Sequence, residues 1–187
     1  MRGAGLVRVR WTVVAVAAAL LVLPRLLGAQ VPTQGINVHG HWVIEVRDAD
    51  GTLRVRREFE NAFQGQQALA QVLAGVTPMG LWIVFASSGS GGSNLCSGPT
   101  VGVCRIVEPG SGFAADSWTF KNLTKTVSGA FELVLQGSFV VSNSGTVNSV
   151  ATEIAPPGFI FTSTNLPSPI PVQATQTVSV TVTISFS

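Results

Sequence analysis

The most regular pattern of the chain lies at its C-terminal end, where apolar and hydroxyl side chains alternate without interruption. The apolar positions of this stretch are Val178, Val180, Val182, Ile184 and Phe186. A period of two predicts a β-strand with one buried face and one wet face. Residues 38–60 show the same period on both sides of a turn sequence at Asp48–Gly51, which predicts a β-hairpin.

Further strand signals follow at short intervals. Residues 81–86 are a continuous apolar run, whose length and aromatic content indicate a strand buried on both sides. The other predicted strands are Trp118–Leu123, Thr126–Ser142 with a bend at Gly129 or Gly137, Val147–Ala155 and Phe159–Ser163. The proline-rich Leu166–Pro171 segment predicts extended chain that is not a central strand.

One segment has the helical period instead. Residues 62–74 carry a one-sided apolar stripe that includes Phe63 and Ala70, with Asn61 as the expected N-cap and Gly75 as the expected end. Many short strands, closely spaced turn signals and this one short helix predict a mainly β protein. We expect an antiparallel β-sandwich, Ig-like or jelly-roll-like.

The first 29 residues differ from the rest. They begin with a basic stretch, continue with the uncharged run Trp11–Leu23 and end in small residues, which is the arrangement of a secretory signal peptide. The alternative is a membrane anchor, but a span needs about 20 apolar residues, and Pro24 and Arg25 interrupt this run. We expect residues 1–29 to be a signal peptide and residues 30–187 a single secreted β-sandwich domain. That domain would be extracellular or at the cell surface, with no membrane span after signal removal.

The chain has two cysteines, Cys96 and Cys104. A Ser/Gly-rich stretch, residues 87–98, leads into this pair, with Cys96 near its end and Cys104 after it, and its composition predicts a flexible, exposed loop. In an exported protein such a pair predicts a disulfide. The alternatives are redox chemistry, which normally uses a C-x-x-C spacing, and metal binding, which needs more ligands.

Charge is sparse and unevenly placed. Four of the eleven basic residues lie in the first 29 residues, so signal removal leaves seven bases against nine acids, a net charge of −2. This balance argues against nucleic acid as a partner. After Lys125 there is no base, and Glu132 and Glu153 are the two acids. An uncharged final strand is either paired inside the sheet or available to another subunit.

Candidate catalytic and metal-binding groups are few. His39 and His41 share one strand face, but a metal site needs a third ligand, and none is identifiable. The Asp48–Gly51 sequence resembles the start of a Ca²⁺ loop without its glutamate, so a hairpin turn is favoured. Glu58 and Glu60 share a face with arginines, which favours a solvated charged face over a catalytic pair. We therefore predict no catalytic, cofactor-binding or metal residues and no enzymatic activity.

One N-terminal stretch and three C-terminal segments of the chain carry a resemblance. They resemble small phage and viral virion proteins of the tail-fibre or baseplate accessory type. The N-terminal stretch is residues 40–75, which includes Asn61–Gly65 and Ala68–Gly75. The C-terminal segments are Thr146–Ala151, Leu166–Val172 and Gln176–Phe186, where Ser149 and Ala151 replace a usual Glu and Gly. The resemblance implies a β-sandwich with a structural role and no catalytic residues. Because a signal peptide departs from a virion part assembled in the cytoplasm, a cellular filament or surface-layer subunit fits better.

These observations lead to one functional prediction and one alternative. The prediction is a non-enzymatic secreted structural protein that self-assembles into an extracellular filament, fibre or surface coat by β-strand pairing between subunits. The pairing residues would be Val178, Val180, Val182, Ile184 and Phe186, or the segment 30–38 after the cleavage site. The alternative is an extracellular adhesin or carbohydrate-binding module, with Trp118 as its ligand platform.

Overall fold

The computed structural model describes residues 37–63, 65–74, 80–89, 95–97, 102–114, 116–129, 131–155 and 158–187. All of them belong to one compact unit, residues 36–187. The expected signal peptide, residues 1–29, lies outside the described residues. Among the described residues, no helix has the length and apolar character that a membrane crossing requires.

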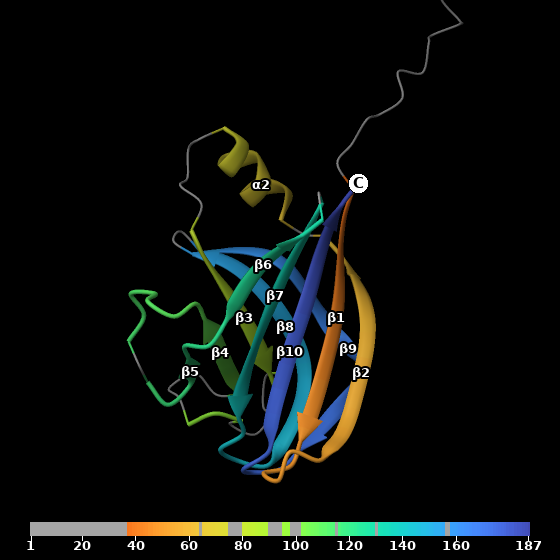
Figure 1. The fold of residues 1–187 in the computed structure, drawn as a ribbon, viewed down its shortest axis with the longest axis vertical. Helices are drawn as coiled ribbons and strands as arrows, with labels where there is room; N and C mark the ends of the chain where they lie inside the picture. Colours follow the sequence, from red (N-terminus) through yellow and green to blue (C-terminus); the bar gives the residue numbers. More distant parts are fainter. Residues whose placement is uncertain are drawn as a thin grey trace, which may run out of the picture. The chain divides into compact units, whose positions relative to one another are not determined.

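In the described part of the chain, ten strands form two five-stranded sheets (Figure 1). The first sheet has the order β2-β1-β10-β7-β6, with the bounds β2 Leu53–Ala62, β1 Val38–Arg47, β10 Thr177–Phe186, β7 Glu132–Val140 and β6 Thr124–Ser128. The second has the order β5-β4-β3-β8-β9, with the bounds β5 Thr119–Phe120, β4 Val103–Val107, β3 Leu81–Ser87, β8 Gly145–Ala155 and β9 Phe159–Val172. Neighbouring strands are antiparallel, except that β5 runs parallel to β4. The prediction of a mainly β, antiparallel sandwich is confirmed.

The predicted hairpin is formed by β1 and β2. Trp42 lies opposite Phe59 in its register, and their rings stack with centroids 6.2 Å apart. The turn closes with a hydrogen bond from the Asp48 N–H to the Thr52 carbonyl. Gly51 adopts a φ of 85°, a conformation that favours glycine. Alternate residues of β1 are buried, so one face of the strand lies in the core, as the pattern predicted.

The predicted long strand, residues 126–142, is instead a hairpin. β6 and β7 are separate antiparallel strands, and Gly129, with a φ of 63°, lies in the connection between them. Gly137 does not bend the chain but lies within β7, facing the other sheet. A Cβ at this position would be 2.5 Å from Cγ2 of Ile106 on β4, so glycine allows the two sheets to approach closely here.

In the second sheet two predictions are confirmed, and one predicted strand is shorter than expected. β3 lies between β4 and β8, and its residues Trp82, Ile83 and Val84 are all buried, as expected of a strand covered on both faces. The proline-rich segment belongs to β9, at an edge of the sheet, where a residue without an N–H group is tolerated. The predicted strand 118–123 is reduced to the two residues of β5.

The core lies between the two sheets. Its largest fully buried side chains include Trp42, Ile44, Leu135, Phe139 and Ile184 from the first sheet. The inward side chains of the second sheet that complete this core are Trp82, Val84, Ala86, Ile106, Val150, Phe161 and Ile170. Because alternate residues of each strand point inward, the core is assembled from both sheets at once.

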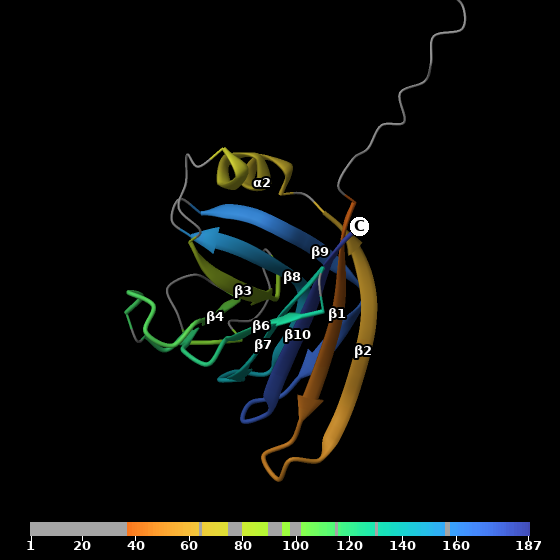
Figure 2. The same ribbon diagram turned by 45° about the horizontal axis from the view of Figure 1, so that its top comes forward.

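The helix α2, Gln66–Leu73, is shorter than predicted and packs beside β9 (Figure 2). Asn61 is not its N-cap, which corrects the prediction. β2 continues through Asn61 because it pairs with β1, and the buried Asn61 side chain accepts a hydrogen bond of 3.0 Å from Trp42 Nε1. Ala70, assigned to the apolar stripe, is exposed. The predicted end at Gly75 lies outside the described residues.

Candidate functional site

Cys96 and Cys104 form a disulfide with a Cα–Cα distance of 5.5 Å, which confirms the predicted cross-link. Both cysteines are fully buried and belong to the core between the sheets. The preceding Leu95 is also fully buried, and its carbonyl accepts a hydrogen bond from the Ser142 N–H. The prediction of an exposed loop is therefore wrong at residues 95 and 96, because the disulfide and this hydrogen bond hold them in the core.

The final strand β10 lies at the centre of the first sheet. It pairs with β1 along all of its length and with β7 on its other side, so Val182 lies between Trp42 and Leu135. Of the residues predicted to pair with a neighbouring subunit, Val178, Val180, Val182 and Ile184 are fully buried in the core, and Phe186 packs against it. In the folded chain both edges of this strand are already paired, so β10 offers no free edge to another subunit. Of the other predicted segment, residues 30–38, Val38 belongs to β1 and residues 30–36 lie outside the described residues.

The edges of the two sheets lie instead at β2, β6, β5 and β9. Three of these strands carry features that hinder pairing with another chain. β2 presents exposed charged side chains, β5 has two residues, and β9 contains Pro167 and Pro169, which have no N–H group to donate. β6 has fewer such features, because it has no proline, is longer than β5, and has Lys125 as the one charged residue among its five exposed residues.

Lys125 forms an ion pair within the chain. Its Nζ lies 3.1 Å from Oε1 of Glu108, which is the residue after β4. A lysine on a sheet edge normally opposes pairing because its ammonium group would lose water. Here the carboxylate of Glu108 offsets part of that cost, so the lysine protects the edge less than an unpaired one would.

Exposed apolar side chains lie beside β6. Val127 in β6 is 72% exposed, and Phe131, the residue before β7, is 68% exposed. We call this surface the β6 edge and define it as residues 124–128 and 131. Further along β7, Asn122 covers the edge by itself: its Nδ2 donates to the Ser138 carbonyl and its Oδ1 accepts from the Ser138 N–H. The unprotected part is therefore confined to the β6 edge.

Trp118, the predicted ligand platform, is partly buried and packs against the core. The guanidinium group of Arg105 lies 4.0 Å from the centroid of its ring, a cation–π contact. The ring face toward Arg105 is therefore occupied from within the chain. The role of Trp118 as a platform stays a prediction.

The charged groups of the β1–β2 hairpin pair with one another on its outer face. His41 Nδ1 lies 2.8 Å from Glu60 Oε1, while His39 is exposed on the same face. Within the described ranges, no group of three or more His, Cys, Asp or Glu side chains is arranged to hold a metal ion.

The turn that resembles a Ca²⁺ loop is organised by hydrogen bonds. Gln176 Nε2 donates to Asp48 Oδ1 at 2.8 Å, and this bond, together with Arg54, lowers the pKa of Asp48. The Asp50 carboxylate accepts a hydrogen bond from the Thr52 N–H, which lowers the pKa of Asp50. Both carboxylates therefore have partners within the chain, as a hairpin turn requires.

Comparison of the chain with protein-family models, with curated proteins and with solved structures finds no match. The resemblance to virion accessory proteins stays a prediction.

Proposed function

We propose that this protein is a non-enzymatic, secreted structural subunit that assembles outside the cell through the β6 edge. The observation that carries the proposal is that, among the edge strands of the described chain, β6 has no proline and is longer than β5, and its single charged residue, Lys125, is paired with Glu108. Pairing at this edge replaces the role that the sequence assigned to β10.

The chemistry of β6 suits pairing with a second copy. In an antiparallel arrangement centred on Thr126, Lys125 of each copy lies opposite Val127 of the other, so the two ammonium groups are not directly opposed. The hydroxyl residues Thr124 and Ser128 lie opposite each other, and such pairs stabilise sheets. The two first sheets would then form one continuous sheet across the pair, with Phe131 of each copy close to the junction.

A two-fold contact of this kind closes after two copies. The pair is therefore the proposed building block, and a filament, fibre or coat grows by a second contact between pairs. The outer face of β10 carries uncharged Ser and Thr residues, so β10 itself contributes no like charge to such a contact.

The experiment measures the molar mass of the purified protein by light scattering over a range of concentrations, with electron microscopy of the concentrated sample. We expect concentration-dependent association, and we expect the double variant Val127→Lys/Phe131→Lys to be monomeric. Both side chains are highly exposed, so the fold should tolerate the change. Leu53→Lys is the matched control, because Leu53 is an exposed apolar residue of the β2 edge and should leave association unchanged.

Two results would refute the proposal. A wild-type protein that stays monomeric at every concentration would exclude assembly. Association that survives the double variant but is lost in Leu53→Lys would place the contact at β2.

A further inference from the structure

The outer face of the second sheet is unusually apolar for the solvent side of a sandwich. Leu81, Ile83 and Phe85 alternate along β3 on the face that points away from the core, and Val107 and Ala155 flank them on β4 and β8. Ile83, Val107 and Ala155 are buried in a cluster that is separate from the main core. The apolar run of β3 predicted burial on both sides, and this cluster is the second side.

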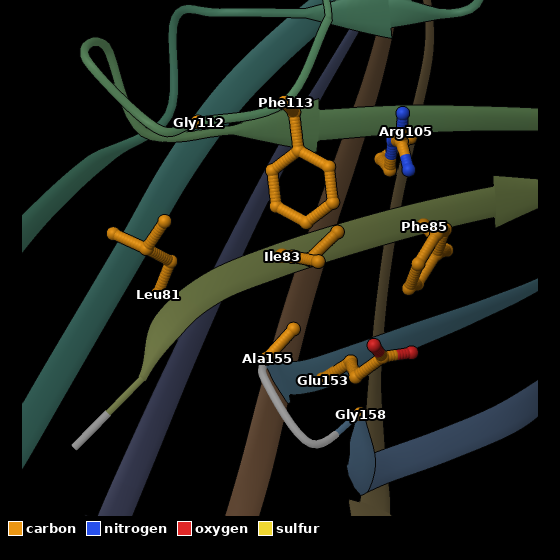
Figure 3. Close-up of a pocket in the computed structure, with 9 residues that line it drawn as sticks. All are labelled: Leu81, Ile83, Phe85, Arg105, Gly112, Phe113, Glu153, Ala155 and Gly158. Carbon is orange, nitrogen blue, oxygen red and sulfur yellow. The ribbon is translucent and has the colours of Figure 1, made fainter. Parts of the chain in front are cut away.

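A pocket of about 540 Å³ lies over this cluster (Figure 3). Its floor is formed by the apolar residues of β3, and Phe113 from the segment after β4 overhangs it. The volume falls within the usual range for small-ligand sites. The figure shows Arg105 and Glu153 on opposite sides of this floor.

The positive side of the pocket is fully engaged within the chain. The Arg105 guanidinium group lies 4.4 Å from the centroid of Phe113 and stacks on Trp118. Its Nη2 donates to Thr119 Oγ1 at 2.7 Å and lies 3.5 Å from Asp116 Oδ2. Arg105 therefore fixes the wall of the pocket and has little capacity to bind an anion.

The negative side of the pocket is the carboxylate of Glu153, which lacks, among the described residues, the partners that Arg105 has. Glu153 is partly buried on the outer face of β8, and no hydrogen bond or ion pair joins its carboxylate to the residues that the structure describes. Burial raises the pKa of this carboxyl, and the charge of Arg105 only partly opposes the effect. Gly158 lies next to it: a Cβ there would be 3.2 Å from Glu153 Oε1, so glycine keeps the space beside the carboxylate open.

We propose that this pocket binds a small organic cation whose apolar body packs on Ile83 and Phe113 and whose ammonium group reaches Glu153. An ammonium group would supply the hydrogen bonds and the opposite charge that the carboxylate lacks. The rings of Phe85 and Phe113 favour an aromatic or aliphatic body, and they also attract a cation that approaches a ring face. The pocket belongs to the second sheet and the β6 edge to the first, so this proposal and the assembly proposal can fail independently.

The test uses three probes of similar shape that differ in charge: phenethylammonium, phenethyl alcohol and phenylacetate. Each is titrated into the purified, isotopically labelled protein, and amide chemical shifts are followed by NMR. We expect phenethylammonium to bind most tightly, with shifts concentrated in β3, β4 and β8, and phenylacetate to bind least. Equal binding of the amine and the alcohol, no binding of any probe, or shifts located elsewhere would overturn the proposal.

Two variants separate charge from shape. Glu153→Gln should weaken phenethylammonium binding by about tenfold or more, because the replaced hydrogen bond is charge-assisted, while alcohol binding stays unchanged. Glu132→Gln is the matched control, since Glu132 is an exposed carboxylate on the other sheet. An equal loss in both variants would contradict the role of Glu153. Tighter binding of a blocked lysine amide than of phenethylammonium would overturn the small-molecule assignment in favour of a protein segment.

Discussion

The disulfide between Cys96 and Cys104 allows a quantitative prediction. The two cysteines are eight residues apart in the sequence. In the chain-entropy description, closing a loop of this length stabilises the folded state by about 2.5 kcal/mol at 25 °C. For a domain of this size, that free energy corresponds to a melting temperature lower by about 5–10 °C when the cross-link is removed.

The variant for this test is Cys96→Ala/Cys104→Ala. Alanine is preferred to serine because both positions are fully buried, and a hydroxyl group there would lack a partner. Thermal unfolding is followed by circular dichroism for the variant and the wild type. As a control, reductant should leave the melting temperature of the double variant unchanged.

The buried position of the disulfide adds a second expectation. Because a thiolate must reach a sulfur atom to reduce it, reductant should act on the wild type only as the protein unfolds. A double variant that melts within about 1 °C of the wild type would refute the loop-entropy reasoning. Rapid reduction of the folded wild type at low temperature would contradict the burial of the two cysteines.

Three further substitutions test the interior and the outer pocket. Trp42→Phe removes the N–H group that donates to Asn61 Oδ1, and Asn61 Nδ2 already has no partner among the described residues. The buried amide would then be unsatisfied, so urea unfolding should show a free energy of unfolding lower by about 2–3 kcal/mol. An unchanged urea midpoint would contradict this expectation. Gly137→Ala should cost about 1–3 kcal/mol through contact with Ile106, and a double-mutant cycle with Ile106→Ala should show that the two losses are not additive. Glu153→Gln addresses pH: a raised folded pKa means that ionisation opposes folding, so the variant should melt higher than the wild type at neutral pH, with the difference vanishing below about pH 4. A difference that grows as the pH falls would refute that sign.

Part of the candidate site was predictable and part was not. The cysteine pair was readable because the chain has two cysteines only eight residues apart, and the expected export favours a disulfide between them. The β6 edge was hidden in a longer predicted strand, Thr126–Ser142, because nothing in the local pattern distinguishes a bend at Gly129 from a reversal. The pocket left one signal, the apolar run at residues 81–86, which indicated two buried faces without identifying what covers the outer one.

Local alternation of apolar and polar residues was sufficient to predict the buried faces of the first hairpin and the final strand. Alternation at Val178–Phe186 and around the turn at Asp48–Gly51 is a local property of the chain, and it predicted the strands and the hairpin correctly. The order of the strands in each sheet is visible only in the folded chain. The fold placed β10 between β1 and β7, drew Asn61 into β2 rather than a helix cap, and left β6 unpaired on one side. The physical reason is that side-chain alternation records burial residue by residue, whereas strand order depends on hydrogen bonds between segments far apart in the sequence.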